Sequence, residues 1–540
     1  MSKKRVGFYC LLTGVAYSLS VSNLLDGFNW GILAWIALLP LHRVLIGVTT
    51  RQAFLRGWLA GFFAFTGTMY WVVVAMHLYG QIPLSISIAL MLLLTIYLGL
   101  FIGVYAWGFV WMEQRWAAMA WGLAPCLWVS LEFLRTYAFS GLPWGLFGYS
   151  QFRWLPIIQV SDITGVYGVS FSIVLANVAL FLLLRWPLTK HSPRTTRLLP
   201  WPPLAVATVT VLVVWIYGLF SLNSSSFSDR PTLNVGVVQA NIDQARKWDT
   251  AYRMETLERY ARLTKSVAEH SDVIIWPEAA TPFLFEQENG YQDLVVEMVK
   301  NAQLPLVFGS PALRRHADGR PYLLNSAYVL SPQGEITGRY DKQHLVPFGE
   351  YIPLKRVLFF LDKLVVGIGD FQPGPGPTLL SIPYGPDQKD VRFGVAICYE
   401  VIFPDLVRRL AHAGTNFLVT ITNDAWFGDT VAPHQHFATV VFRAVENRMA
   451  FVRAANTGIS GFIGPSGEIL ANTPLFMEQA ISESIPLGSP ATFYTRFGDA
   501  FAWACVIMTL FLLLCARFFR KPSAVDTIFQ HPSSRRHKKE

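Results

Sequence analysis

The chain has 540 residues, of which 53% are hydrophobic and 15% are charged, and its formal net charge is +9. Soluble globular chains carry about 25% charged residues, so this composition excludes an ordinary soluble protein and indicates a membrane protein. The positive charge lies mainly in short loops between apolar runs and in the last stretch of the chain, so we expect no nucleic-acid partner.

Residues 1–226 contain seven apolar runs of about 20 residues, the length that crosses the hydrocarbon core of a bilayer. An eighth run lies near 500–517, so we expect a final membrane helix over 498–520. The first run follows the basic segment SKKR and has no small-residue cleavage site, so we expect it to be retained. The seven runs are 6–24, 29–47, 54–77, 83–111, 116–135, 163–184 and 201–221.

Lysine and arginine are concentrated in alternate loops between these runs. Since cytoplasmic loops carry an excess of these residues, the pattern predicts a cytoplasmic amino terminus. Seven crossings then place residues 231–485 on the outer side, and the eighth returns the basic tail, 521–540, to the cytoplasm. The cations used are Lys3, Lys4, Arg5, Arg43, Arg51, Arg56, Arg115, Arg185, Lys190, Arg194 and Arg197.

Residues 231–485 have the pattern of a separate α/β domain. Short β-rich runs alternate with amphipathic segments, which predicts a layered α/β fold. The runs 323–330 and 335–340 are joined by SPQG and predict a hairpin. The other expected strands are 233–239, 272–278, 305–310, 391–397, 416–422, 450–455 and 459–464, and the expected helices are 248–269, 291–301, 403–413 and 435–449.

Polar residues follow several of these strands. Glu278 ends one, Cys398 another, and Asn423 and Asp424 a third, while Lys342 follows the hairpin. Taken singly, the Glu and the Lys are typical of solvated turns and the Cys of a small buried hydrophobe. Together they fit one chemistry, in which a carboxylate takes the proton of a thiol and an ammonium stabilises the resulting negative charge. The remaining cysteines, Cys10, Cys126, Cys505 and Cys515, fall in predicted spans.

The motifs around these residues resemble the nitrilase, or carbon–nitrogen hydrolase, superfamily. They are WPEAAT around Glu278, YDKQHLVPFGEY around Lys342 and CYEVIFP around Cys398. The resemblance implies an αββα sandwich with a Glu–Lys–Cys triad. The whole chain, with GLPWGLFGYSQ (141–151), KWD (247–249), NDAWFGD (423–429) and PHQHF (433–437), resembles the apolipoprotein N-acyltransferase family.

This resemblance implies an enzyme of the bacterial inner membrane, with its catalytic domain in the periplasm and both termini in the cytoplasm. It implies transfer of an acyl chain from a phospholipid, typically phosphatidylethanolamine, to the α-amine of an S-diacylglyceryl cysteine on an apolipoprotein. Cys398 would be the nucleophile, Glu278 the general base and Lys342 the oxyanion stabiliser, in a ping-pong scheme through a thioester. The resemblance adds four supporting or substrate-binding residues: Glu350, which would orient Lys342 or assist proton transfer, Tyr399, Glu400 and Trp248.

Lipid substrates require a site that faces the bilayer. The apolar segments 282–285 and 357–371 are candidate lids, with a place in the core as the alternative, and residues 141–154 have the composition of an interfacial aromatic segment. His434 and His436 have no third ligand at metal-binding spacing, so we expect a structural role, no metal and no cofactor. We expect a monomer.

Two other functions fit parts of the sequence. A membrane-tethered amidase or nitrilase would use the same triad on a small C–N substrate, but it needs neither seven spans nor apolar lids. A transporter or scaffold with an inactive external domain is opposed by the intact triad and by the scarcity of charged residues in mid-span. Lipid dependence separates the first alternative from the acyltransferase, and activity that is lost in Cys398→Ala excludes the second.

Overall fold

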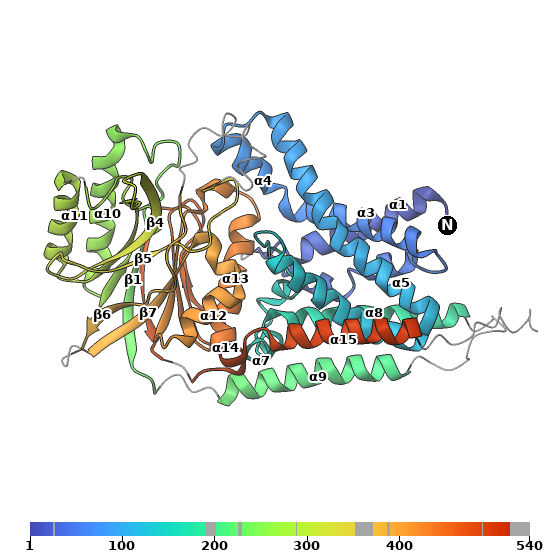
Figure 1. Ribbon diagram of the computed structural model, residues 1–540. Helices are drawn as coiled ribbons and strands as arrows, with labels where there is room; N and C mark the ends of the chain where they lie inside the picture. The colour runs from blue at the N-terminus through green and yellow to red at the C-terminus, as the bar shows by residue number, and fades with distance from the viewer. Residues whose placement is uncertain are drawn as a thin grey trace, which may run out of the picture.

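The computed structural model describes residues 1–24, 27–189, 201–224, 229–287, 289–351, 371–385, 389–488 and 490–518. It has two parts, an α/β domain and a bundle of apolar helices, which pack against each other (Figure 1). The candidate lid at 357–371 lies outside the described residues except for Phe371, and the tail at 521–540 lies wholly outside them.

Two sheets form the centre of the α/β domain. Within the described residues each has six strands, in the orders β12-β1-β2-β3-β4-β5 and β11-β10-β9-β8-β7-β6. The inner strands β1, β2 and β3 are parallel, as are β7, β8 and β9, and the outer pairs are antiparallel. The first sheet comprises β1 (Thr232–Gln239), β2 (Val273–Ile275), β3 (Leu306–Arg315), β4 (Pro321–Leu330), β5 (Ile336–Asp341) and β12 (Gln479–Pro486). The second comprises β6 (Leu380–Tyr384), β7 (Lys389–Ile397), β8 (Phe417–Thr422), β9 (Phe451–Ala455), β10 (Gly461–Ile463) and β11 (Ile469–Asn472).

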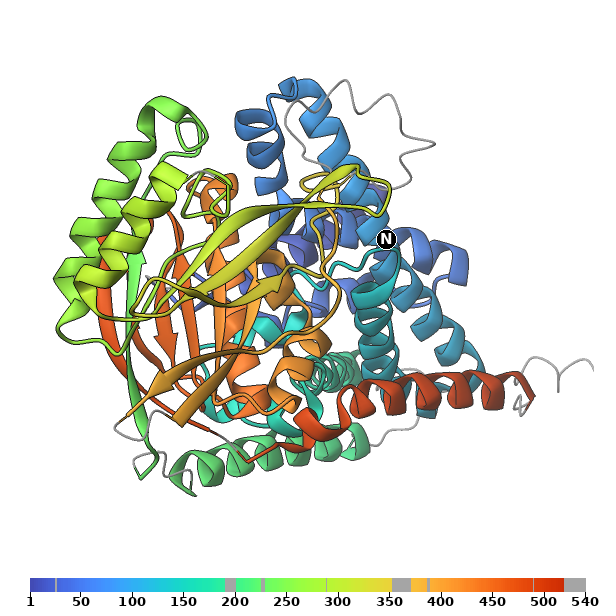
Figure 2. The same ribbon diagram turned by 60° about the vertical axis from the view of Figure 1, so that its left-hand side comes forward.

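The expected αββα layering is present. Apolar side chains of both sheets, among them Val237, Ile275, Val395 and Val419, interlock in one buried core. Helices α10 (Arg253–Ala268) and α11 (Asn289–Ala302) cover the outer face of the first sheet, and Figure 2 shows this layer from another side. Helices α12 (Pro404–His412) and α13 (Ala432–Asn447) lie between the second sheet and the apolar helices.

The expected strands and helices of this domain form, and the hairpin pairs in antiparallel register. Strands β6, β11 and β12 were not predicted. Each lies at an edge of its sheet. The residues of β11 and β12 are half-exposed, so these strands show little of the apolar alternation that identifies a strand in a sequence. Strand β6 contains Pro383, which disfavours a strand assignment from sequence.

The apolar part of the chain is helical. Its longest element, α5, has one residue with non-helical backbone angles, Trp116, which separates the two runs expected at 83–111 and 116–135. The long elements are α1 (Lys3–Ser20), α3 (Thr50–Met69), α5 (Leu84–Tyr137), α8 (Val166–Thr189), α9 (Trp201–Ser224) and α15 (Ala500–Phe518). The short ones are η1 (Trp30–Trp35), α2 (Leu39–Val44), α4 (Trp71–Val74), η2 (Ala75–Tyr79), η3 (Phe147–Gln151), α6 (Leu155–Ile158), α7 (Ser161–Thr164) and α14 (Phe493–Phe497).

The apolar run expected at 29–47 forms two short helical elements, η1 and α2, with a break between them. The side chain of Asn177 on α8 satisfies the break, since its amide donates to the Ala34 carbonyl (2.8 Å) and its oxygen accepts from the Leu38 N–H (2.9 Å). Backbone that leaves the helix inside a membrane needs such protein partners. Pro40 further interrupts the helical ladder.

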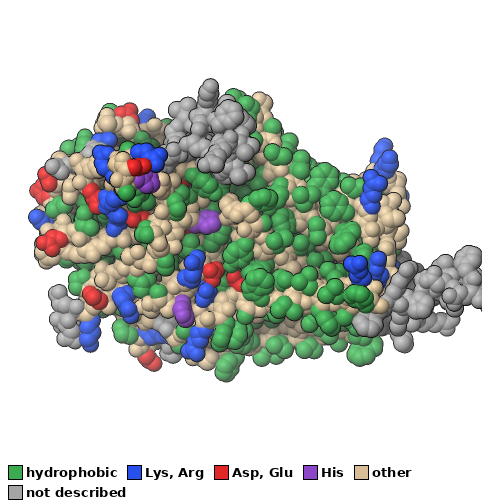
Figure 3. All heavy atoms as spheres, in the orientation of Figure 1, with side chains coloured by type: hydrophobic (Ala, Val, Ile, Leu, Met, Phe, Trp, Pro, Cys, Tyr) green, Lys and Arg blue, Asp and Glu red, His purple; other side chains and the backbone are tan. Residues whose placement is uncertain are grey.

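Among the described residues, four helices are long and apolar enough to cross a membrane, and a pair bent by 49° makes a fifth if it is one span. The helices are Leu84–Ala117, Val166–Arg185, Trp201–Ser224 and Ala500–Phe518, and the pair is Thr50–Met69 with Trp71–Tyr79. Figure 3 shows a surface that is mainly hydrophobic over the helical part, with charged side chains on the α/β domain and Lys and Arg at the opposite end. This distribution is that of a protein embedded in a bilayer by its helical part.

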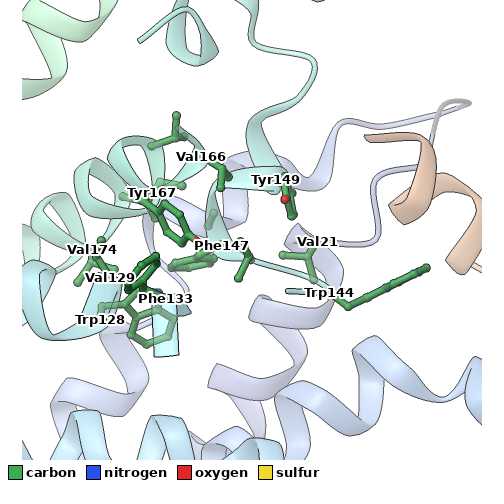
Figure 4. Close-up of a cluster of buried hydrophobic side chains, with 14 of the residues drawn as sticks. Val21, Trp128, Val129, Phe133, Trp144, Phe147, Tyr149, Val166, Tyr167 and Val174 are labelled. Atoms are coloured by element: carbon green, nitrogen blue, oxygen red, sulfur yellow. The ribbon is translucent and has the colours of Figure 1, made fainter. Parts of the chain in front are cut away.

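The aromatic segment 141–154 is not an exposed interfacial segment, contrary to expectation, because most of it is buried between the helices and α13. Phe147 packs against Tyr17 and Trp128 in the cluster of Figure 4. On the other side, the Trp144 indole N–H donates to Gln435 (2.7 Å). The segment therefore joins the helical part to α13, the helix that packs on the second sheet.

Candidate active site

The nucleophile candidate, Cys398, lies directly after β7, where the chain turns into a short 3-10 helix (Cys398–Ile402). Its φ of 52° is in the left-handed region, which non-glycine residues rarely adopt. The Cys398 carbonyl accepts a hydrogen bond from Nε2 of His436 (3.2 Å). A strained backbone held by a neighbouring side chain is typical of a functional site, and here it fixes the direction of the thiol.

Glu278 follows β2, and two amides hold its carboxylate. Asn325 Nδ2 donates to Oε1 (2.8 Å), and the Asn423 backbone N–H donates to Oε2 (2.9 Å). Gly309 on β3 lets the turn approach closely, because a Cβ at that position would lie 2.5 Å from the Ala279 nitrogen. The turn and both donors therefore orient the carboxylate before any substrate arrives.

Lys342 follows β5 and is 1% exposed. Its Nζ lies 2.9 Å from Glu350 Oε2 and 3.6 Å from Glu278 Oε1. Burial opposes the charge, but the carboxylates of Glu350 and Glu278 outweigh it and hold the pKa of Lys342 above its usual range. Asn325 also donates to Glu350 (2.8 Å), so one amide connects both carboxylates that flank the ammonium.

The surroundings of Cys398 favour the protonated thiol. Burial and the nearby Glu278 carboxylate raise its pKa above the usual range, and the opposing effect of Lys342 is smaller. A thiol with a raised pKa needs a base to remove its proton before it can act as a nucleophile. Glu278 is the carboxylate that raises the pKa of both Lys342 and Cys398.

Glu400 is fully buried and connects the turn at Cys398 to the turn at Lys342 through hydrogen bonds. Its carboxylate accepts from the Ile397 N–H (2.7 Å), the Gln343 N–H (2.7 Å), the His344 N–H (3.0 Å) and the Tyr340 hydroxyl (3.0 Å). Burial raises the pKa of Glu400 to about 7. With its oxygens occupied by these donors, Glu400 is a structural tie and not a free base.

The two remaining expected residues, Tyr399 and Trp248, differ in burial. The buried Tyr399 hydroxyl donates to the Gly141 carbonyl (2.9 Å), which links the nucleophile turn to the helical part. Trp248 is 50% exposed at the surface and makes no described hydrogen bond or ring contact. The structure thus brings Glu278, Lys342, Glu350 and Cys398 into one site, and no described contact links Trp248 to it.

A buried polar network contacts the backbone of Cys398 through His436. Arg453 pairs with Asp424 (2.5 Å), and His436 Nδ1 lies 3.1 Å from both partners. Burial opposes the charge on Asp424, but Arg453 and His436 outweigh it and hold its pKa well below the usual range. Among the described residues no three His, Cys, Asp or Glu side chains group as a metal site, and His436 instead holds the Cys398 backbone.

Two residues of the site had no assigned role from sequence. Asn325 lies in the middle of an otherwise apolar strand run, LLNSAYVL, and this polar interruption is the signal that was available. Lys247 belongs to the KWD motif, but sequence alone does not reveal that its ammonium is buried beside Glu278. Segment 282–285 belongs mainly to the core, since Phe283 and Phe285 are buried against the first sheet.

Comparison with known proteins matches both parts of the chain. Residues 13–179 match the family model described as the apolipoprotein N-acyltransferase N-terminal domain, and residues 234–492 match the carbon–nitrogen hydrolase model. An amidase of the nitrilase superfamily from Nesterenkonia AN1 matches with a TM-score of 0.36 and 18% identity, over 50% of this chain and 93% of the amidase.

Relatives named apolipoprotein N-acyltransferase match along most of the chain. The relative from Geobacter metallireducens is 42% identical over 88% of this chain and 89% of its own length. The relative from Pasteurella multocida is 33% identical over 91% of each chain. The chain therefore belongs to the apolipoprotein N-acyltransferase family.

Proposed function

We propose that the chain transfers an acyl group from a membrane phospholipid of the phosphatidylethanolamine type to the α-amine of the S-diacylglyceryl cysteine of an apolipoprotein. One observation carries the proposal: Glu278, Lys342 and Cys398 converge in a carbon–nitrogen hydrolase domain that packs directly on apolar helices. Family membership supports both the reaction and the classes of substrate.

In the first half-reaction the Cys398 sulfur attacks the ester carbonyl of the phospholipid. Glu278 accepts the thiol proton, and the charged Lys342 stabilises the oxyanion. The carbon–oxygen bond of the ester then breaks, the proton passes from Glu278 to the leaving alkoxide, and a lysophospholipid departs. A thioester remains on Cys398.

In the second half-reaction the apolipoprotein amine attacks the thioester carbonyl. A carbon–nitrogen bond forms and the carbon–sulfur bond breaks, while Glu278 takes the proton of the amine and returns one to the sulfur. A thioester is more reactive toward amines than an oxygen ester is, so the acyl group moves on to a stable amide. Water competes with the amine, so the site must exclude it.

The supporting residues have separate roles in this scheme. Glu350 orients the Lys342 ammonium, from which it lies 2.9 Å, and Glu400 keeps the nucleophile turn beside the lysine turn. Tyr399 aligns that turn with the helical part through Gly141. Trp248, which is half exposed, contacts the incoming substrate in this scheme. The reaction as written uses no cofactor or metal.

The proposed placement is the bacterial inner membrane, with eight crossings by α1, the η1–α2 pair, α3–α4, both halves of α5, α8, α9 and α15. The basic loops put the amino terminus and the tail in the cytoplasm, and the α/β domain in the periplasm. The chain acts as a monomer. The charge distribution of Figure 3 supports the embedding of the helical part.

A tethered amidase acting on a small C–N compound is less supported. It shares the triad, but it gives no reason for a match to the acyltransferase N-terminal domain over residues 13–179. An inactive binding domain gives no reason for the buried, carboxylate-paired Lys342 beside Cys398.

The test is intact-protein mass spectrometry of the purified enzyme after incubation with phosphatidylethanolamine and no acceptor. We expect one added acyl mass that hydroxylamine removes and that Cys398→Ala does not acquire. Adding a diacylglyceryl-cysteine peptide with a free amine should then discharge the enzyme, whereas the same peptide with an acetylated amine should not. A folded enzyme that acquires no acyl mass contradicts the ping-pong scheme and favours the amidase.

A further inference from the structure

A second lysine is buried beside the catalytic carboxylate. Lys247 lies in the loop after β1 and is 2% exposed, and its Nζ donates to the backbone carbonyl of Glu278 (3.1 Å). The loop is fixed to the second sheet, because the Ile242 N–H donates to Asn456 (2.9 Å) and Asn423 donates to Gln244 (2.6 Å). The position of the ammonium is therefore set by both sheets.

Lys247 differs from Lys342 in its partners. Lys342 is flanked by two carboxylates, whereas no carboxylate among the described residues lies within ion-pair distance of Lys247. Burial lowers the pKa of Lys247 to about 8, although Glu278 and Cys398 both favour its charged form. A buried lysine that has no carboxylate partner is unfavourable, and such groups occur where function needs them.

The Glu278 carbonyl, which accepts from Lys247, belongs to a turn with unusual backbone angles. Ala279, the next residue, has a φ of 48°, in the left-handed region, and the turn lies against Gly309. No backbone N–H among the described residues donates to the Glu278 carbonyl, so the Lys247 amine is its described donor. Loss of this donor frees the peptide unit from which the Glu278 side chain projects.

We propose that Lys247 is a positioning residue of the active site: its buried amine holds the Glu278 carbonyl, and its charge faces the thiolate that forms on Cys398. This inference rests on the proposed roles of Glu278 and Cys398. The same loop carries the next residue, Trp248, which is 50% exposed. The charged and titratable groups around Lys247 and its partners are Glu278, Lys342, Glu350, Cys398 and Asp424.

Alkylation of Cys398 tests the charge without any phospholipid. A positive charge beside the thiolate accelerates the anionic reagent iodoacetate more than the neutral iodoacetamide, so the ratio of the two rates reports the local field. In Lys247→Met we expect this ratio to fall at least threefold at pH 7, whereas Lys247→Arg should keep it. The exposed Lys265→Met is the matched control, and Cys398→Ala identifies any background from the other cysteines.

The pH dependence separates a charged role from simple packing. In the wild type the ratio should decrease as the pH rises through about 8, where Lys247 loses its proton, and in Lys247→Met it should be constant there. Acyl-enzyme formation should fall about 10- to 100-fold in Lys247→Met, with partial recovery in Lys247→Arg. If Lys247→Met lost activity only because it misfolds, its melting temperature would fall. In that case Lys247→Arg would not recover the reagent ratio.

Two results overturn the inference. One is a Lys247→Met enzyme with the wild-type reagent ratio and an acylation rate within twofold of the wild type. The other is a Lys247→Arg enzyme with the same low ratio as Lys247→Met. If the wild type itself gives no acyl-enzyme but the ratio depends on Lys247 as expected, then the proposed function fails and the role of Lys247 in the site stands.

Discussion

Asn325→Leu removes the amide that connects the two carboxylates beside Lys342 and keeps a side chain of similar size. Asn325 donates to Glu278 Oε1 and to Glu350 Oε1, each at 2.8 Å. Hydrogen bonds to charged groups contribute about 1.5–3 kcal/mol each. The side chains of Glu278 and Glu350 are 11% and 12% exposed, so water replaces part of what is lost.

We therefore expect an effect close to that of one such bond, about 3 kcal/mol, which is about a 100-fold loss of rate. The assay is the rate of acyl-enzyme formation from phosphatidylethanolamine, followed by intact-protein mass spectrometry. Asn234→Leu, at an exposed position on β1, controls for the introduction of a leucine. An Asn325→Leu enzyme that acylates within threefold of the wild type would refute the view that this amide orients the base.

Three further changes test other parts of the site. Gly309→Ala places a Cβ 2.5 Å from the turn that carries Glu278 and should lower the acylation rate at least 10-fold. Gly290→Ala, with open space around it, should not lower it. Equal rates for the two variants contradict a close approach of the Glu278 turn to Gly309. Glu400→Gln leaves at least one of its buried donors without an acceptor and should lower the free energy of unfolding by about 1–3 kcal/mol, measured by chemical denaturation, and an unchanged stability rejects the tie. Burial lowers the pKa of His436, so its contribution to folding stability is fully present above about pH 6.5 and is lost as the pH falls. Between pH 7 and 5 the melting temperature should therefore decline less in His436→Gln than in the wild type or in the exposed His270→Gln. Parallel curves for the three proteins contradict this.

Local patterns in the sequence were sufficient for much of the α/β domain. Strands β1, β3 and β8 are short apolar runs, and α10 has its apolar residues at helical spacing, so each carries its own signal. The motifs around Glu278, Lys342 and Cys398 follow strand ends, where the sites of α/β sheets gather, but Glu278 and Lys342 follow strands of the first sheet and Cys398 follows a strand of the second. The strand ends therefore identified the three residues as candidates, whereas the packing of the two sheets brings them together, and their catalytic roles stay proposals.

The tertiary structure alone decided the features that depend on distant partners. The break near 29–47 is satisfied by Asn177, more than 100 residues away, and a hydropathy pattern does not contain that contact. The aromatic segment 141–154 has the composition of a membrane interface, yet α13 covers it. Composition determines that a segment avoids water, and the fold determines whether lipid or protein covers it.

The same distinction applies within the site. The residues next to Asn325 or Lys247 in the sequence do not reveal its role, because that role depends on the groups that surround it in the folded protein. The separate strands β2, β4 and β5 and the loop after β1 bring a carboxylate, an amide and two ammonium groups together. The amino-acid pattern shows which chemical groups are present and which strands carry them. Only packing of the two sheets decided which group is paired, which is buried without a counter-ion, and which donor holds the base.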